Sequence, residues 1–129
     1  MDKNLEILIS IDNLETYMDD LNDQKYIDKI QELGMTIDTK ALASLEKTRS
    51  DLLDELTPNL KREYLRLKKY YQNSPIPRAI VPIRFERGEG FCFGCSSKIP
   101  AEVFQRVKKY HTIERCENCG RFIFWPPLP

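Results

Sequence analysis

The sequence has no long hydrophobic run and no segment typical of export. None of its stretches approaches the roughly 20 consecutive apolar residues that are needed to cross a bilayer, so we expect no insertion into a membrane. The N-terminal segment carries acidic side chains where a secretory signal peptide has basic ones, and Glu6 interrupts its apolar run from Leu5 to Ile11. We therefore expect a cytoplasmic protein, in which cysteine thiols stay reduced.

Residues that commonly carry catalysis are also scarce. The sequence has a single histidine, His111, and it shows no Ser-His-Asp set, no phosphate-binding loop and no paired-carboxylate signature. We interpret His111 as a surface or structural residue in a strand, and Glu89 and Glu102 as surface charges. The sequence therefore predicts a protein that is not an enzyme and has no small-molecule substrate.

The net charge is zero, but the charges are unevenly distributed along the chain. Residues 1–57 contain 6 basic and 14 acidic residues, a balance of −8, whereas residues 58–129 contain 14 basic and 6 acidic residues, a balance of +8. Such asymmetry indicates an acidic and a basic region with different partners, although each half could simply be solvated. The composition, 41% hydrophobic and 31% charged, favours long helices with narrow apolar stripes over a large core.

The first part of the chain, residues 1–73, has a helical pattern. Its apolar residues recur at steps of four and three, which is typical of a coiled-coil-like stripe; they are Ile7, Ile11, Leu14, Met18 and Leu21. Gly34 predicts a helix end, and Asp38 or Thr39 an N-cap, so we expect an antiparallel helical hairpin with its turn near 34–39. Thr57 and Pro58 predict a new helical start that bends the returning helix.

The rest of the chain is expected to be a linker over 74–77, which contains prolines, and a small zinc ribbon domain over 78–129. We expect Pro82 to confine the first strand to a sheet edge or a bulge. The predicted elements are a strand over 79–85, a turn over 87–90, a helix over 100–108, strands over 110–115 and 121–125, and an extended end over 126–129. The whole chain is thus predicted to be an α+β protein.

Four cysteines occur as two C-x2-C pairs, Cys92 with Cys95 and Cys116 with Cys119, separated by twenty residues. Two such pairs at this spacing are typical of a zinc ribbon, because two intervening residues let two thiolates converge on one ion. We expect Gly94 and Gly120 to supply the positive φ or the close backbone approach that such tight turns require. An iron–sulfur cluster or a redox C-x-x-C motif is the alternative, but the paired spacing favours zinc.

Four thiolates fill the coordination of one zinc ion, so the predicted site is structural and not catalytic. A segment of this size does not build an adequate core by itself. Zinc binding would supply much of its folding free energy, on the order of 10 kcal/mol.

The stretch from Arg62 to Trp125 resembles the C-terminal half of the bacterial C4-type zinc ribbon proteins. The positions that carry the resemblance are Tyr64, Arg66, Val81, Gly94, Pro100, Gly120 and Arg121, together with the four cysteines. The resemblance implies a coiled-coil hairpin, zinc at the cysteines, and binding instead of catalysis. Members of the family are described as probable nucleic-acid binders, and as adaptors or chaperones linked to flagellar and type III secretion systems. The N-terminal helical part of this chain is short for the family.

Two functional hypotheses follow from these features. In the first, basic and aromatic residues bind RNA or DNA through phosphate contacts and base stacking; the candidates are Lys61, Arg62, Arg66, Lys68, Lys69, Arg106, Lys108, Lys109, Arg121 and Trp125. In the second, the chain is purely a protein–protein adaptor that uses the helical hairpin, and the zinc ribbon has only a structural role. A dimer through the helical part is compatible with both hypotheses.

Overall fold

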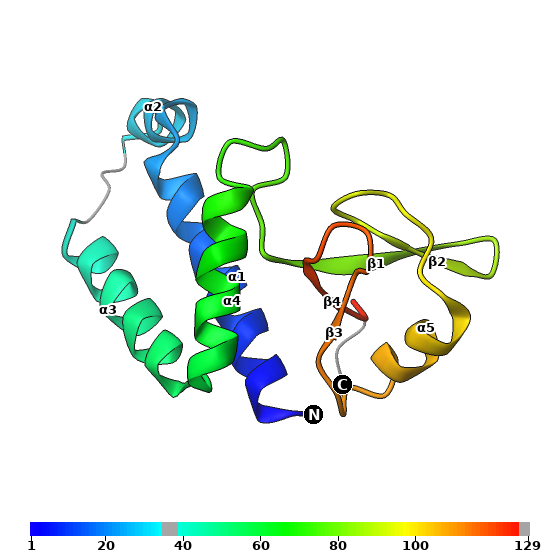
Figure 1. The fold of residues 1–129 in the computed structure, drawn as a ribbon. Helices are drawn as coiled ribbons and strands as arrows, with labels where there is room; N and C mark the ends of the chain where they lie inside the picture. The colour runs from blue at the N-terminus through cyan, green and yellow to red at the C-terminus, as the bar shows by residue number, and fades with distance from the viewer. Residues whose placement is uncertain (35–38, 127–129) are drawn as a thin grey trace.

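The computed structural model describes residues 1–34 and 39–126. A helical N-terminal region is followed by a small sheet with one short helix against it (Figure 1). The elements are α1 (Lys3–Asn22), α2 (Gln24–Glu32), α3 (Thr39–Glu55), α4 (Pro58–Tyr70), β1 (Ile80–Glu86), β2 (Glu89–Cys92), α5 (Ala101–Val107), β3 (Glu114–Arg115) and β4 (Phe122–Phe124). The mixed α+β class expected from the sequence is confirmed. No helix in the described ranges has the length and apolar character needed to cross a membrane.

The helix boundaries follow local signals in the sequence. The Asp23 side chain accepts a hydrogen bond from the Lys25 N–H at 3.0 Å and caps α2, which separates α2 from α1. Gly34 has a φ of +76°, as expected for the residue that ends a helix. Most of the predicted turn near 34–39, including Asp38, lies outside the described residues, and α3 begins at Thr39.

The helical region differs from a simple two-helix hairpin. After α3, the chain reverses at Thr57 and Pro58, and α4 runs back along α1 (Figure 1). Leu8 and Ile11 of α1 are fully buried together with Tyr64 of α4. Leu53 of α3 is buried in the same cluster, so this part of α1 is covered by both α3 and α4. The return part of the chain does not extend as one long helix.

A buried carboxylate joins the three long helices. Glu15 of α1 is 5% exposed and accepts hydrogen bonds from Arg49 Nε of α3 at 2.5 Å and from Tyr64 Oη of α4 at 2.6 Å. Its second carboxylate oxygen also lies 2.9 Å from Lys68 Nζ. Because a buried charge requires partners, this network fixes how the helices lie against each other.

The sheet has the strand order β2-β1-β4-β3, with β1 parallel to β4 and the other neighbours antiparallel. Arg87 and Gly88, both with positive φ, form the two-residue turn between β1 and β2. β1 lies inside the sheet, so the prediction that Pro82 confines this strand to an edge or a bulge is wrong. The strand tolerates proline there because β2 pairs with β1 only from Ile83 onward, and the Pro82 carbonyl still accepts from Phe93 N at 3.2 Å.

The second expected strand, over 110–115, is shorter than the sequence pattern indicates. Tyr110 has a φ of +58°, which an extended strand does not accommodate, and β3 comprises only Glu114 and Arg115. His111 is exposed and lies in a bend before β3, not in a strand.

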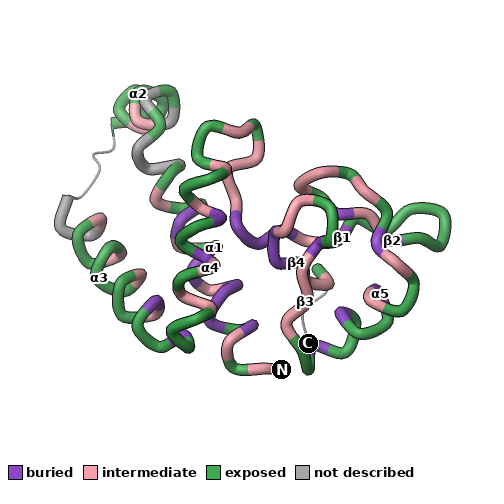
Figure 2. The backbone as a smooth tube through the Cα atoms, viewed as in Figure 1, coloured by how far each residue is buried: buried purple, intermediate pink, exposed green. Residues whose placement is uncertain are grey.

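Alternate residues of the central strands face two different cores. Ile80 and Phe122 are buried with the helices, whereas Val81 and Ile123 are buried with the cysteines and α5. Figure 2 shows this buried backbone where β1 and β4 meet the helical region. The sheet is therefore covered on both faces, and the helical region and the ribbon share a core.

Candidate metal centre

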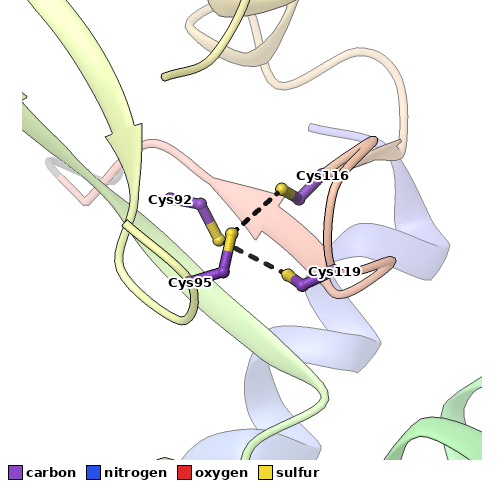
Figure 3. A group of neighbouring side chains, drawn as sticks. All are labelled: Cys92, Cys95, Cys116 and Cys119. Atoms are coloured by element: carbon purple, nitrogen blue, oxygen red, sulfur yellow. Dashed lines mark hydrogen bonds between the residues drawn. The ribbon is translucent and has the colours of Figure 1, made fainter. Parts of the chain in front are cut away.

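The four cysteines converge from two turns at adjacent parts of the sheet (Figure 3). Cys92 ends β2 and Cys95 follows in the next turn, while Cys116 follows β3 and Cys119 precedes β4. All four sulfur atoms lie within 4.8 Å of one another. The Cys92–Cys119 and Cys95–Cys116 sulfur pairs are 3.7 and 3.6 Å apart. Tetrahedral zinc with bonds of about 2.3 Å places its sulfur ligands about 3.8 Å apart, so the site fits one zinc ion.

Both turns have the same backbone hydrogen bonds. The Ser96 N–H donates to the Cys92 carbonyl, and the Gly120 N–H donates to the Cys116 carbonyl, each at 2.8 Å. Ser96 and Gly120 also share a left-handed backbone, with φ values of 63° and 78°. The two cysteine turns are thus equivalent knuckles, and Ser96 holds the position that glycine holds in the second knuckle.

Of the two roles expected for glycine in a knuckle, a positive φ or a close approach, Gly94 has the second. It does not have a positive φ, but a Cβ atom at this position would lie 2.5 Å from Arg121 Nη1 and 2.7 Å from Arg121 Cδ. Glycine therefore lets the Arg121 side chain pass directly against the first knuckle.

The thiols lie in different electrostatic environments. Burial raises the pKa of the Cys92 thiol and of the Cys116 thiol. Burial also opposes ionisation of Cys95, but hydrogen bonds from Asn118 and Ser97 outweigh it and lower the pKa of this thiol to about 6. Because zinc binds thiolates, metal binding must displace the protons that Cys92 and Cys116 otherwise retain.

Two arginines hold the knuckles to the rest of the protein. Arg115 Nε donates to the Gly120 carbonyl at 2.8 Å. Arg121 donates to the Arg78 carbonyl at 2.9 Å and to the Ile76 carbonyl at 2.8 Å, and its guanidinium lies 3.6 Å from the centre of the Tyr71 ring. Arg121 is only 3% exposed. The expectation that it belongs to an exposed binding surface does not fit this burial.

Tyr71 adds a direct link from the helical region to the metal centre. It directly follows α4, and its hydroxyl donates to the Cys119 carbonyl at 2.5 Å. The metal centre, the linker and the end of α4 are therefore one connected structure. The sequence did not reveal this contact, because the two residues lie 48 positions apart.

The other predicted binding residues form two groups, one on α4 and one at the end of α5, with the sheet between them (Figure 1). On α4, Arg62, Arg66 and Lys69 are exposed. Lys61 pairs with Asp54, and Lys68 points inward to Glu15 and to the Pro77 carbonyl.

In the α5 group, Arg106 pairs with Glu114, and Lys109 is exposed. Lys108 lies over the rings of Phe104 and Trp125, and Trp125 is half-buried. The structure therefore does not bring all the predicted residues onto one surface.

The sulfur geometry and the paired knuckles agree with a comparison of sequence families. Residues 92–123 match the family model of the C4-type zinc ribbon domain. This match confirms, for this part of the chain, the resemblance proposed from the sequence. The C4-type zinc ribbon supplies all four metal ligands, and its donor set suits one structural zinc ion. No curated protein matches the sequence.

The fold is similar to that of a solved bacterial protein, HP0958. The HP0958 protein from Helicobacter pylori is 17% identical, with a TM-score of 0.54 over 82% of this chain and 39% of that chain. CT398 from Chlamydia trachomatis is 24% identical, with a TM-score of 0.48 over 79% of this chain and 38% of that chain. This chain therefore spans less than two fifths of either structure. The likeness to HP0958 concerns the fold alone.

Proposed function

We propose that this protein is a non-catalytic binding protein that binds single-stranded nucleic acid through the exposed face of α4. The observation that supports the proposal is that Arg62, Arg66 and Lys69 lie on one exposed side of the helix. Residues spaced by four and three share a helix face. On the same exposed side, Leu65 is 39% exposed and Tyr70 is 74% exposed. We call this set, residues 62, 65, 66, 69 and 70, the α4 face.

The α4 face has the chemistry that single-stranded nucleic acid requires. Its cations can contact phosphates, and the Tyr70 ring is available to stack on a base. Arg66 pairs with Glu63 at 2.8 Å, but an exposed pair of this kind contributes little and can be replaced by a phosphate contact. The opposite side of α4 is buried through Tyr64 and Leu67, so the helix presents this face as part of a fixed structure.

The zinc ribbon supports this face without taking part in chemistry. Four cysteine ligands leave no open position on a tetrahedral zinc ion, which a catalytic zinc needs. The Tyr71–Cys119 hydrogen bond connects the metal centre to the end of the α4 face. In this proposal, zinc therefore maintains the binding surface through the fold.

The proposal can be tested by replacing the three cations together. We expect the combined variant Arg62→Gln, Arg66→Gln and Lys69→Gln to bind single-stranded RNA or DNA more weakly. The slope of log K against the logarithm of the salt concentration should become less negative by about 2, because three phosphate contacts are lost. A matched control replaces Lys3, Lys29 and Lys47 by glutamine; these residues are also exposed, and the net charge changes equally. Equal loss of binding in both variants would show only a general charge effect and would contradict the α4 proposal.

A second candidate is the protein adaptor, for which the exposed apolar residues of the helical region are the supporting observation. Tyr17 is 52% exposed and Leu33 is 71% exposed. The resemblance to the C4-type zinc ribbon proteins extends this proposal to a partner in a flagellar or type III secretion system. A partner that co-purifies after nuclease treatment and is lost in the double variant Tyr17→Ser and Leu33→Ser would favour the adaptor function.

A further inference from the structure

A surface pocket of about 670 Å³ lies on the ribbon, away from the α4 face. Its lining residues come from the β1–β2 hairpin, from the loop before α5 and from α5. Its buried apolar residues are Phe104, 6% exposed, and Ile99, 3% exposed. A Cβ atom on Gly90 would lie 2.7 Å from the Phe104 ring, so glycine here allows close packing. We call this site the hairpin pocket.

An exposed aromatic ring lines the hairpin pocket. Phe85 is 53% exposed although it is a large apolar side chain. Its ring stacks on Phe104, with centroids 5.8 Å apart and planes at 8°, and meets the Trp125 ring edge-on at 5.9 Å. These contacts hold the exposed ring in place before any ligand arrives. A fixed exposed aromatic at a pocket with mixed apolar and polar lining is typical of a binding surface.

Two lysines, Lys98 and Lys108, line the hairpin pocket. Lys98 pairs with Glu89 at 3.0 Å, and both side chains are about half-exposed. Lys108 Nζ lies 5.2 Å from the Phe104 ring centre and 5.8 Å from that of Trp125. No carboxylate among the described residues forms an ion pair with Lys108. The lining therefore has a net positive charge and one ammonium group available for an incoming carboxylate.

We infer that the hairpin pocket docks a short segment of a partner protein in which an aromatic side chain lies next to acidic residues. The aromatic ring would pack on Phe85 and Phe104, because offset or edge-to-face ring contacts are favourable. The neighbouring carboxylate would pair with Lys108. The charge of the lining argues against a nucleic-acid strand here, since Glu89 lies at the rim and a strand needs several cations along its backbone. This inference does not depend on the proposed α4 function.

The test uses the zinc-loaded full chain and a short fluorescein-labelled peptide with one phenylalanine between aspartates. We expect saturable binding in fluorescence anisotropy, with amide shifts in NMR spectra confined to Phe85, 88–90 and 98–108. Phe85→Ala is expected to weaken binding about tenfold, as for a central aromatic contact. Lys108→Gln is expected to weaken it about threefold to fivefold, more at low salt than at high salt.

Matched controls separate the pocket from general effects. Phe93→Ala removes another exposed aromatic, and Lys109→Gln removes the neighbouring lysine; neither residue lines the pocket, and both variants should bind like the original protein. Ala101→Trp should abolish binding by filling the pocket, even if Phe85→Ala disturbs the aromatic cluster. Peptides with alanine for phenylalanine, or asparagine for aspartate, should bind more weakly.

Several results would overturn the inference. One is unchanged peptide binding by Ala101→Trp. Another is displacement of the peptide by a single-stranded oligonucleotide with amide shifts at the same residues, which would assign the pocket to nucleic acid. Concentration-dependent shifts of the same amides without peptide would instead assign it to a second copy of this chain.

Discussion

Ser96 and Gly120 occupy equivalent positions in the two knuckles, but only glycine is suited to the positive φ that both positions have. At a positive φ, the backbone of any residue other than glycine is strained, because its Cβ lies too close to the following carbonyl oxygen. Space is not the reason, because a Cβ on Gly120 would meet its nearest atom at an ordinary contact distance of 3.5 Å. The two positions therefore isolate the backbone contribution to knuckle stability.

We predict opposite effects for exchanges at these two positions. Ser96→Gly should stabilise the zinc-loaded protein by about 0.5–1 kcal/mol, and Gly120→Ser should destabilise it by about 1 kcal/mol. Denaturant unfolding at saturating zinc measures both free energies. Destabilisation by Ser96→Gly would show that the serine side chain contributes more than its backbone strain costs.

The cysteines themselves give the second prediction. Cys116→Ser should bind zinc far more weakly and lose the ribbon structure, because a structural zinc site supplies folding free energy. Metal analysis and circular dichroism measure the two losses. His111→Ala provides the control: His111 is exposed and outside the sulfur cluster, so this variant should retain zinc and fold normally. Zinc retained by Cys116→Ser at the original affinity would contradict the four-ligand site.

The ligands were predictable from the sequence, but their supporting residues were not. Spacing along the chain identifies Cys92, Cys95, Cys116 and Cys119 because each knuckle is a local structure. Aligning the two knuckles by their cysteines would have identified Ser96 as the counterpart of Gly120. The role of Gly94 could not be found in this way, because it depends on Arg121, which approaches through space.

At the scale of elements, Arg121 connects the linker, the end of α4 and the second knuckle. Its guanidinium satisfies two backbone carbonyls, those of Ile76 and Arg78, and lies against Tyr71. A lysine could not reproduce both contacts, because its single ammonium lacks the planar fork of arginine. This arginine therefore orients the ribbon relative to the helices.

We predict that Arg121→Met destabilises the protein by about 2–3 kcal/mol, since two backbone carbonyls lose their charged donor. The zinc ligands remain, so zinc should still bind at a stoichiometry of one. Arg106→Met is the control, because Arg106 is exposed and makes only a surface pair with Glu114. Thermal unfolding of both variants, together with zinc analysis, measures the difference. Equal loss of stability in the two variants would contradict the proposed role of Arg121 in connecting the ribbon to the helices.

The helices were predictable from their periodicity, but the path of α4 was not. Apolar spacing and the Thr57-Pro58 start indicate where the helices form, since these signals are local. The reversal at Pro58 depends on burial of Tyr64 against Glu15, 49 residues earlier in the chain. Likewise, the interior position of Pro82 depends on where β2 ends, and a single strand's sequence does not contain that information.

At the scale of the whole molecule, the sheet is the boundary between two cores and belongs to both. Ile80 and Phe122 pack with the helices, and their neighbours Val81 and Ile123 pack with the zinc site. The N-terminus is also tied to the ribbon, because the Asp2 N–H donates to the Tyr110 carbonyl at 2.8 Å. Loss of the ribbon therefore removes part of the helical core.

We predict that zinc removal destabilises the helices and the ribbon together. With zinc bound, far-UV circular dichroism, dominated by the helices, and the fluorescence of Trp125 should report one unfolding transition. A chelator should shift both midpoints down. Acid should act in the same direction: burial raises the pKa of the Cys92 and Cys116 thiols, so protons compete more strongly with zinc as the pH falls.

Two variants distinguish this coupling from a general effect of the chelator. In Cys116→Ser, both signals should already unfold at the lower midpoint, and chelator or mild acid should shift them little further. Phe122→Ala should lower the midpoint of the helical signal even at saturating zinc, because Phe122 is 1% exposed and packs with the helices. A helical transition that is insensitive to both zinc and Phe122→Ala would mean that the helices fold independently, despite the core that they share with the sheet.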